Sequence, residues 1–480
     1  MNGVPPDVPA TQSSGLHRRL GVFEVTALSV GFMGPVMAMS LNGIGVAGLV
    51  GKAVPFTFAV SFAGTLLVAY AFIRLTRYFT RAGSVYALAG STLGPRAGFF
   101  GGFALLGTYM FFAACITGAC AVFFEAMLTE LGVSLPPFGW VAVVLVVTVV
   151  ALLLNIRESV VTTRVLLGIG FVGIAAMVVL GVVIVMRVGS ADAPVSTGID
   201  LSTLAPSGVA ANAVMTASVF GFLSWAGFES GTSLAEETKR PEKNIPRSLL
   251  LAVVLAGFLY VFVMFAQTIG YGTDEAGTNA FANASSTLTE LSSRYIGAWF
   301  AVAISVIAFF VALASLISST AAAARLVFAL ARDGFGPPAL AHVNHRGAPS
   351  TAVFLISGLT TALTLGLAFA GQGPVEVYYW YATIATLCMV LAYAMTSVGA
   401  IRHAFKPASP IPVWEIVFPV LGLGYLAYVF GVQIIGQEAP YTYFPILAGI
   451  WCLVGLVVVF VRPDLAQRIG DRLTREDLDT

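Results

Sequence analysis

The sequence predicts an all-α membrane protein that crosses the bilayer twelve times. Apolar residues make up 58% of the 480 residues and charged residues only 10%, far outside the range of soluble globular domains. Windows of about 20 apolar residues, the length of a helix that spans a bilayer, recur along the chain, and basic residues gather in alternate connections. The predicted spans are approximately 21–48, 54–75, 97–129, 138–155, 159–187, 211–236, 248–271, 296–323, 350–370, 377–402, 413–434 and 441–461.

The basic residues also predict the orientation of the chain. With both termini inside, all of the 24 Lys and Arg residues fall on the cytoplasmic side except Lys52, Arg187 and Arg294. We therefore expect a multi-pass protein of the cytoplasmic membrane, with membrane lipid as its surroundings and no nucleic-acid partner. The transmembrane domain is predicted at 20–462, between a disordered cytoplasmic tail at 1–19 and a second cytoplasmic tail at 463–480.

The first span contains its own interruption. Gly31 and Gly34 tolerate non-helical backbone angles, and Pro35 removes a backbone donor and clashes with the preceding turn. The helix is therefore predicted to break near its middle.

The sixth span carries a carboxylate, Glu229, at membrane depth. Glycines at 221, 227 and 231 weaken the helix around it, and a polar connection follows at 235–248. Placing an ionisable group in the hydrocarbon region costs a few kcal/mol or more of free energy. The presence of Glu229 there therefore suggests a functional role. Broken backbone at this depth requires protein or a polar cavity around it, so the two breaks predict a shared polar site.

The positions of the two breaks predict an inverted repeat. If 21–187 and 211–402 are five-span repeats, the odd number of spans gives them opposite topology, and each begins with a broken helix. Residues 413–461 then form two accessory helices. Freed N–H groups attract an anion and freed carbonyls attract an ammonium group, which suits a zwitterion such as an amino acid.

Other motifs are uninformative. Cys115, Cys120, Cys388 and Cys452 lie within apolar spans without CxxC spacing, which favours small buried side chains over metal ligands. We expect no metal, no cofactor and no enzymatic activity, because no nucleophile with a base partner is evident.

Three stretches resemble the amino acid-polyamine-organocation superfamily of permeases, whose members share the LeuT-type fold of 5+5 inverted repeats. The similar stretches are RAGSVYALAGSTLGPRAGFFGG at 81–102, FGFLSWAGFESGTSLAEETKRPEKNIPRSL at 220–249 and AARLVFALARDGFGPPALAHVNHRGAPSTA at 323–352. The resemblance runs from about residue 20 to 460.

The resemblance implies a substrate site at the two breaks. The backbone amides of Phe32, Met33 and Gly34, shaped by Gly31 and Pro35, would bind a carboxylate. Carbonyls of Ser224, Trp225, Ala226 and Gly227 would meet an amino group. Trp225 and Phe228 would cover the pocket, with packing between helices as the alternative.

One face of the third span is a further candidate. Tyr109, Ala113 and Thr117 lie one helical turn apart. By similarity this face lines the pocket, and a packing stripe is the alternative.

The resemblance also bears on ion coupling. Glu229 matches an acidic position that is a candidate proton carrier, the alternative being a structural carboxyl. The position where some relatives place a lysine falls near Gly170, which excludes a lysine-based switch. Ser318, Ser319 and Thr320 are candidate sodium ligands by analogy with the fold's second ion site, although local bonds to helix carbonyls are the preferred explanation. Glu236 and Glu237 are predicted as an inner gate or a solvated ion-pair cluster.

The implied function is secondary active transport of an amino acid or amine by alternating access, as a proton-coupled symporter or exchanger. Sodium coupling and a transporter-like sensor or subunit of a heteromeric exchanger remain alternatives. The sequence leaves the substrate and the oligomeric state open.

Overall fold

A computed structural model describes residues 20–80, 84–157, 160–206, 208–332, 334, 337–344, 347–406, 409, 411–461 and 464. Both predicted tails fall outside this part of the chain, except Asp464. Within it every regular element is helical, and the single β-type pairing is an isolated parallel bridge between Leu20 and Thr238. The predicted all-α class is therefore confirmed.

Eleven segments of the described chain are long and apolar enough to cross a membrane. The first, Val22–Leu75, has 54 residues, which at about 1.5 Å per residue is far longer than a bilayer of roughly 30 Å. It turns back at Gly51, which has a φ of 54°, and thus holds two of the predicted spans. The eleven segments together contain all twelve.

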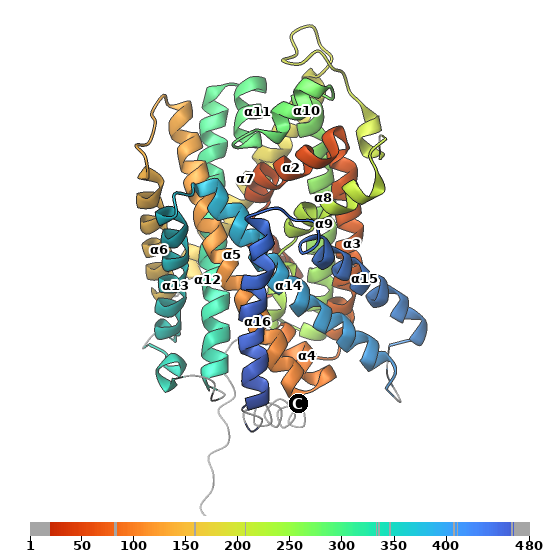
Figure 1. Ribbon diagram of the computed structural model, residues 1–480, viewed down its shortest axis with the longest axis vertical. Coiled ribbons are helices and arrows are strands. Elements are labelled where there is room, and N and C mark those ends of the chain that lie inside the picture. The colour runs from red at the N-terminus through yellow and green to blue at the C-terminus, as the bar shows by residue number, and fades with distance from the viewer. Residues whose placement is uncertain are drawn as a thin grey trace, which may run out of the picture.

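Short helices such as α4, α10 and α11 lie at the ends of the bundle of membrane-spanning helices (Figure 1). In chain order they are α1 (Val22–Met33), α2 (Pro35–Val50), η1 (Gly51–Ala53), α3 (Val54–Leu75), α4 (Val85–Leu93), α5 (Pro95–Glu130), α6 (Gly139–Arg157), α7 (Val160–Arg187), η2 (Leu201–Leu204), α8 (Ala211–Leu223), η3 (Phe228–Glu237), α9 (Pro241–Tyr271), α10 (Glu275–Ala282), α11 (Thr287–Tyr295), α12 (Ala298–Arg332), η4 (Pro338–Ala341), α13 (Ser350–Phe369), α14 (Pro374–Ala404), η5 (Val413–Ile416), α15 (Val417–Val432), η6 (Tyr441–Tyr443) and α16 (Phe444–Val461).

Some helix limits differ from those predicted. The predicted connection at 235–248 is mostly helical, because η3 runs to Glu237 and α9 already begins at Pro241. Proline suits the first turn of a helix, and the acid of Glu242 behind it favours the positive end of the helix dipole. Polar residues at this end of the span hid the helix from a search for apolar windows.

Both predicted breaks are present. α1 ends at Met33, Gly34 takes the left-handed conformation (φ 58°, ψ 61°), and Pro35 begins α2. α8 ends at Leu223, and η3 begins after Gly227, which is also left-handed with a φ of 92°. The broken-helix feature of the predicted fold is therefore confirmed.

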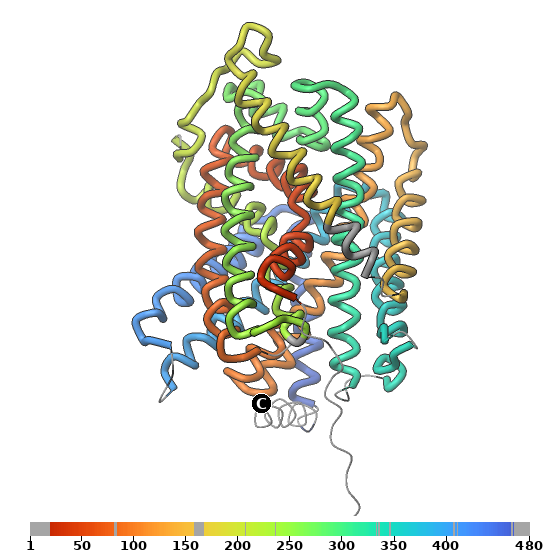
Figure 2. The backbone as a smooth tube through the Cα atoms, turned by 180° about the vertical axis from the view of Figure 1, so that it is seen from behind, coloured from red at the N-terminus to blue at the C-terminus, as the bar shows by residue number. Residues whose placement is uncertain are grey.

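The halves of the broken helices pack in pairs. α2 lies against α8, and α1 lies against η3 and α9. α5 packs along both α12 and α14, while α15 packs on α3 and α14 at the periphery (Figure 1). Seen from behind, α7 crosses the bundle obliquely (Figure 2). We call the end that carries α4 the α4 end, and the opposite end, with α10 and α11, the α11 end.

Candidate functional site

The two breaks touch each other at Phe32 and Gly227. A Cβ atom added at Gly227 would lie 2.0 Å from Cδ1 of Phe32, so only a glycine fits against this ring. One turn further, a Cβ at Gly231 would lie 2.6 Å from the Ser29 hydroxyl. The glycines of the sixth span therefore make room for α1 as well as permitting the break.

Glu229 lies directly beside this contact. Its side chain is only 1% exposed, and its two carboxyl oxygens accept hydrogen bonds from two tyrosine hydroxyls. Tyr109 of α5 donates to Oε1 at 3.0 Å, and Tyr393 of α14 donates to Oε2. The carboxyl thus connects η3 to two helices that are not themselves broken. Since buried polar groups need partners, these hydroxyls make the burial of Glu229 tolerable.

Aromatic rings enclose the two tyrosines. Tyr393 meets the edges of Phe72, Phe222 and Phe228 at centroid distances of 5.2, 6.5 and 5.5 Å. Phe32 packs against Tyr109 at 5.6 Å. Glu229 therefore sits in an apolar wall with hydroxyl groups as its hydrogen-bonding partners, an arrangement that tolerates a neutral carboxyl as well as a charged one.

The carbonyl freed at the first break also has a partner. Ser315 of α12 donates its hydroxyl to the carbonyl oxygen of Phe32 at 3.0 Å. Ser315 was not predicted. It lies four residues before Ser319 and so on the same side of α12, but hydroxyls in an apolar helix usually bond to their own helix, which hid its role.

Two hydroxyls near these elements lack a partner. Ser29 of α1 and Ser319 of α12 are fully buried, and neither hydroxyl has a hydrogen-bond partner among the described residues. Ser318, the other predicted ligand, is half-buried, and Thr320 is buried. Each of these buried oxygens lacks a partner that a bound cation or a water molecule could supply.

At the predicted carboxylate site, the Gly34 N–H donates to the carbonyl of Gly31 at 3.3 Å. One of the three predicted amides is therefore already used within the chain in this conformation. The first backbone N–H groups of any α-helix lack an acceptor within the helix. In α2 these are the N–H groups that follow Pro35.

A second polar cluster lies on the other side of the breaks, toward the α11 end. Asn42 of α2 donates from Nδ2 to the Ser224 hydroxyl at 2.8 Å and accepts from the Tyr378 hydroxyl at 2.8 Å. All three side chains are buried. Ser224 was predicted as a substrate contact through its carbonyl, and its side chain ties the break of α8 to α2. Neither Asn42 nor Tyr378 was predicted.

Trp225 and Phe228 pack between helices. Trp225 stacks on Phe62 at 6.0 Å and donates from Nε1 to the carbonyl of Val253 at 3.3 Å, which places its ring between α3 and α9. Phe228 meets the edge of Phe72 at 5.4 Å. In this conformation both rings therefore make the contacts expected of aromatic packing between helices. Ala226 is buried within the same turn.

The residues predicted to share one face of the third span, which is α5, contact different neighbours. Tyr109 reaches Glu229, but the Thr117 hydroxyl donates to the carbonyl of Ala114 and shares a hydrogen bond of 2.9 Å with Thr364 of α13. Ala113, which lies between Tyr109 and Thr117 in the sequence, is fully buried. The structure thus brings Tyr109, and not Thr117, to the site.

At the α4 end, the start of α1 is bonded to the end of η3. Leu20 donates its N–H to the carbonyl of Glu237 at 3.0 Å, and its carbonyl accepts from the N–H of Lys239 at 2.9 Å. The side chain of Glu237 is half-buried, and that of Glu236 lies outside the described part of the structure. The described contact between α1 and η3 at this end is made by backbone, and an inner gate or ion-pair cluster at the two acids stays a prediction.

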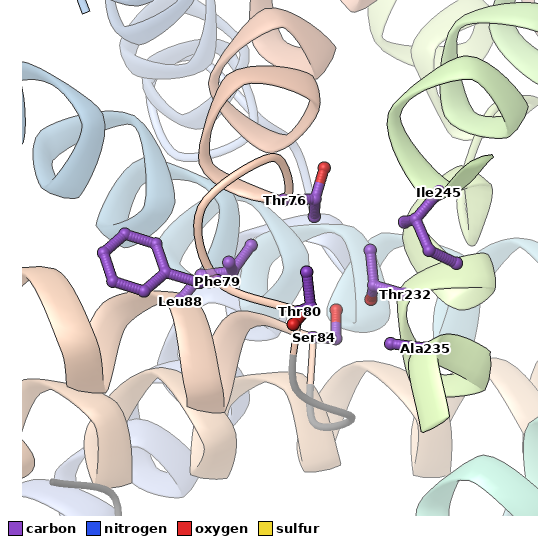
Figure 3. A pocket seen from close by; sticks show the side chains of 8 residues that line it. All are labelled: Thr76, Phe79, Thr80, Ser84, Leu88, Thr232, Ala235 and Ile245. Atoms are coloured by element: carbon purple, nitrogen blue, oxygen red, sulfur yellow. The ribbon is translucent and has the colours of Figure 1, made fainter. Parts of the chain in front are cut away.

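A crevice opens beside η3 at the α4 end. It is shallow: the space of about 220 Å³ there includes open solvent, and the side chains leave no room for a water molecule between them. Figure 3 shows its lining: Thr76, Phe79, Thr80, Ser84 and Leu88 from the stretch of chain between α3 and α4 and its flanks, and Thr232, Ala235 and Ile245 from η3 and α9. Half of these side chains carry a hydroxyl.

Metal-binding residues do not gather in the described part of the chain. No group of three or more His, Cys, Asp or Glu side chains lies together there. The four cysteines are buried as free thiols. Gly170, at the position where a lysine was considered, has open space around it.

Comparison with known proteins gives one consistent result. The sequence model of a family described as "Amino acid permease" matches residues 20–472. The chain is 28% identical over 336 residues to the low-affinity putrescine importer PlaP of Escherichia coli, covering 68% of this chain and 70% of the relative. It is 25% identical over 475 residues to the branched-chain amino acid permease BcaP of Bacillus subtilis, covering 93% of both. It is also 25% identical over 426 residues to the human cationic amino acid transporter 4, covering 85% of this chain and 63% of that protein.

Proposed function

Because the chain belongs to the amino acid permease family, we propose that it is a secondary active transporter that moves an amino acid or a related amine by alternating access. The observation that carries the proposal is the contact of the two broken helices at Phe32 and Gly227, beside the buried carboxyl of Glu229. Paired breaks at the interface of inverted repeats are where such folds bind their substrates.

The substrate would lie between the breaks. Its carboxylate would meet the positive end of α2 near Gly31 to Pro35, and its amino group would meet carbonyls of the turn from Ser224 to Gly227. Met33 and Phe32 would form the floor of this site. Since the hydrogen bonds to Glu229 come from neutral hydroxyls, the described residues around it offer no cation for a second carboxylate. We therefore expect neutral or cationic amino acids and amines as substrates, and poor transport of glutamate.

The distribution of basic residues favours one orientation of the protein in the membrane. The α4 end carries Arg74, Arg77 and Arg96 around α4, whereas Lys52 lies at the α11 end. Since basic residues favour the inner side, we propose that the α4 end faces the cytoplasm and that the protein resides in the cytoplasmic membrane.

Glu229 would carry the coupling proton. When the site faces outward the carboxyl would take up a proton, and when it faces inward it would release the proton to the cytoplasm. Glu229→Gln keeps the shape and hydrogen bonds of a protonated carboxyl but cannot release a proton. We expect this variant to lose accumulation driven by a pH gradient while it still binds and exchanges substrate.

The orphaned hydroxyls of Ser29 and Ser319 favour one second candidate, coupling to sodium. In that case accumulation would follow a sodium gradient, and Ser319→Ala would raise the sodium concentration needed for half-maximal uptake. Uptake that is independent of sodium at constant pH gradient would exclude it.

The experiment is uptake of labelled amino acids and amines by proteoliposomes that contain this chain alone, under imposed pH and sodium gradients. Uptake by the wild type that Glu229→Gln loses, with substrate exchange retained, supports the proposal. Binding of substrate without flux or exchange would overturn it in favour of a sensor or of a subunit that needs a partner.

A further inference from the structure

The chain just after α3 meets the last turn of α14 at the α4 end of the protein. The ring of His403 on α14 packs against Phe79 at 5.3 Å and against Tyr78 at 6.2 Å. Arg402, beside His403, donates to the carbonyl of Leu93 at the end of α4 at 3.0 Å. The end of α14 and the start of α15 project from the side of the bundle near α4 (Figure 1). We call the region formed by residues 77–79, 402–406 and 413–415 the α3–α14 corner.

The α3–α14 corner carries an excess of positive charge. Arg77, Arg402 and Lys406 are all exposed there, and the guanidinium of Arg402 has further N–H donors beyond the one that bonds to α4. The acid of the corner, Glu415, is buried and accepts a hydrogen bond from Arg74 at 2.7 Å. α4 and the last turns of α3 and α14 contain no acidic residue. The three exposed cations are therefore not neutralised by these neighbouring elements.

An imidazole nitrogen in the same corner lacks a partner. Nδ1 of His403 is buried, and it has no hydrogen-bond partner among the described residues. Buried polar atoms of folded proteins nearly always have one. An imidazole N–H can donate to an acceptor such as a phosphate oxygen. The unpartnered nitrogen thus points to a ligand with a hydrogen-bonding group at this corner.

Large apolar side chains lie next to the basic ones. Phe405 and Trp414 are 67% and 68% exposed, and Val413 and Tyr78 are exposed as well. Aromatic side chains gather where the headgroups of a bilayer meet its acyl chains. A free anion would contact only the basic side chains. A ligand that joins an anionic headgroup to acyl chains would contact both kinds of side chain.

We propose that the α3–α14 corner binds an anionic phospholipid from the bilayer leaflet at the α4 end. Its headgroup lies among Arg77, Arg402 and Lys406, and its acyl chains run past Phe405 and Trp414. Each Lys or Arg beside an anionic lipid surface raises the affinity about fivefold. The lipid joins the end of α14 to the end of α3, and so steadies the helix that bonds to the carboxyl of Glu229.

The test variant is the double substitution Arg77→Gln, Lys406→Gln. Both side chains are exposed, so their replacement should leave the melting temperature without lipid near that of the wild type. The matched control is Lys243→Gln, Arg247→Gln at the start of α9, which also removes two exposed cations. Arg402 is left in place because it bonds to α4.

Thermal unfolding of the detergent-purified protein with added phosphatidylglycerol measures binding. We expect the melting temperature of the wild type and of the control to rise together, and the test variant to need about 25-fold more lipid for the same rise. Phosphatidylcholine and inorganic phosphate at equal concentration should raise it less. Equal curves for the test variant and the control, or an equal rise with phosphatidylcholine, would overturn the proposal. An equal rise with inorganic phosphate would overturn it too, in favour of a site for free anions.

Fluorescence quenching tests where the lipid lies. Phospholipids with brominated acyl chains quench the tryptophans that they contact. The quenching that is lost on Trp414→Phe should be larger with brominated phosphatidylglycerol than with brominated phosphatidylcholine. Equal losses with the two lipids would show that the anionic lipid has no preferred place at this corner. Neither measurement needs transport, so the lipid site and the proposed function can fail separately.

Discussion

Tyr378 and Tyr393 lie on the same helix, α14, and each donates a hydrogen bond to a different broken helix. Tyr378 donates to Asn42 of α2, toward the α11 end, and Tyr393 donates to Glu229 of η3, toward the α4 end. At 1.5 Å per residue the two tyrosines are about 22 Å apart along the helix. α14 thus contacts both sides of the proposed substrate site.

Tyr378→Phe is expected to open the α11 end without affecting the α4 end. The change removes the hydrogen bond to Asn42 and leaves the buried amide oxygen without a partner, which costs about 1–3 kcal/mol. Hydrogen–deuterium exchange should increase in the part of α2 nearest the α11 end and at the start of α14. The KM for external substrate should change more than the maximal rate.

The control for this variant is Tyr381→Phe. Tyr381 lies on the same helix but donates to the carbonyl of Leu363 on α13, so it does not connect α14 to a broken helix. Equal exchange patterns in the two variants would show that Tyr378 has no special part in closing this end.

Gly227→Ala is expected to abolish transport and to destabilise the protein. Its Cβ would lie 2.0 Å from Phe32, and the backbone φ of 92° is unfavourable for alanine. Overpacking alone typically costs 1–3 kcal/mol, so the melting temperature should fall. A smaller residue in Phe32→Leu should restore part of the lost stability in the double variant.

Gly366→Ala provides the comparison. Gly366 lies in α13 with open space around it, so alanine should be neutral or stabilise the helix by about 0.5–1 kcal/mol. If Gly227→Ala were as well tolerated as this variant, the close contact of the two breaks would not be a feature of the working protein.

Thr117→Val is expected to leave substrate affinity unchanged. The Thr117 hydroxyl is bonded toward α13, so its loss should lower stability by about 1 kcal/mol and leave the KM as in the wild type. A large rise in KM for Thr117→Val would show instead that this side chain lines the substrate pocket.

Tyr109→Phe, which removes a donor to Glu229, should alter the pH dependence of uptake.

The connection around Asp200, at the α11 end, offers a test by pH. Hydrogen bonds from Ser202 and from the ammonium group of Lys52, 2.9 Å away, lower the pKa of Asp200 to about 2. Since the unfolded pKa is about 4, the stabilising contribution is fully present above that pH and is lost as the pH falls through the folded value. Asp200→Asn should therefore melt earlier than the wild type near pH 7, by a small amount because the pair is partly exposed.

The difference in melting temperature between Asp200→Asn and the wild type should shrink between pH 4 and pH 2. Differential scanning fluorimetry of the two proteins across this range measures it. A difference that stays constant down to pH 2 would show that the aspartate carboxylate does not stabilise the connection.

The breaks were predictable from sequence, and the partners of Glu229 were not. Gly34, Pro35 and Gly227 act on their own backbone, so their effect can be inferred from their identity and their neighbours. Tyr393 meets Glu229 across 164 positions of sequence, and no local pattern marks that pairing. α4, α10 and α11 were missed because short helices at the membrane surface have no apolar window of spanning length.

The division of the α5 face has a geometric reason. Eight residues rotate a helix by about 80° beyond two full turns. The side chains of Tyr109 and Thr117 therefore point in different directions, although each residue is about one turn from Ala113. α5 is buried against α12, α13 and α14 along most of its length. For such a helix, spacing alone does not reveal which neighbour a side chain meets.

The two backbone hydrogen bonds of Leu20 have a practical consequence. Because Leu20 is bonded on both sides to the chain around Thr238, a pull or a load applied at the start of the chain is passed directly to η3. A bulky label or surface tether attached immediately before residue 20 would therefore restrain the segment that holds Glu229. The same label attached after α16, which packs on α5 and α14, would leave that segment free to respond.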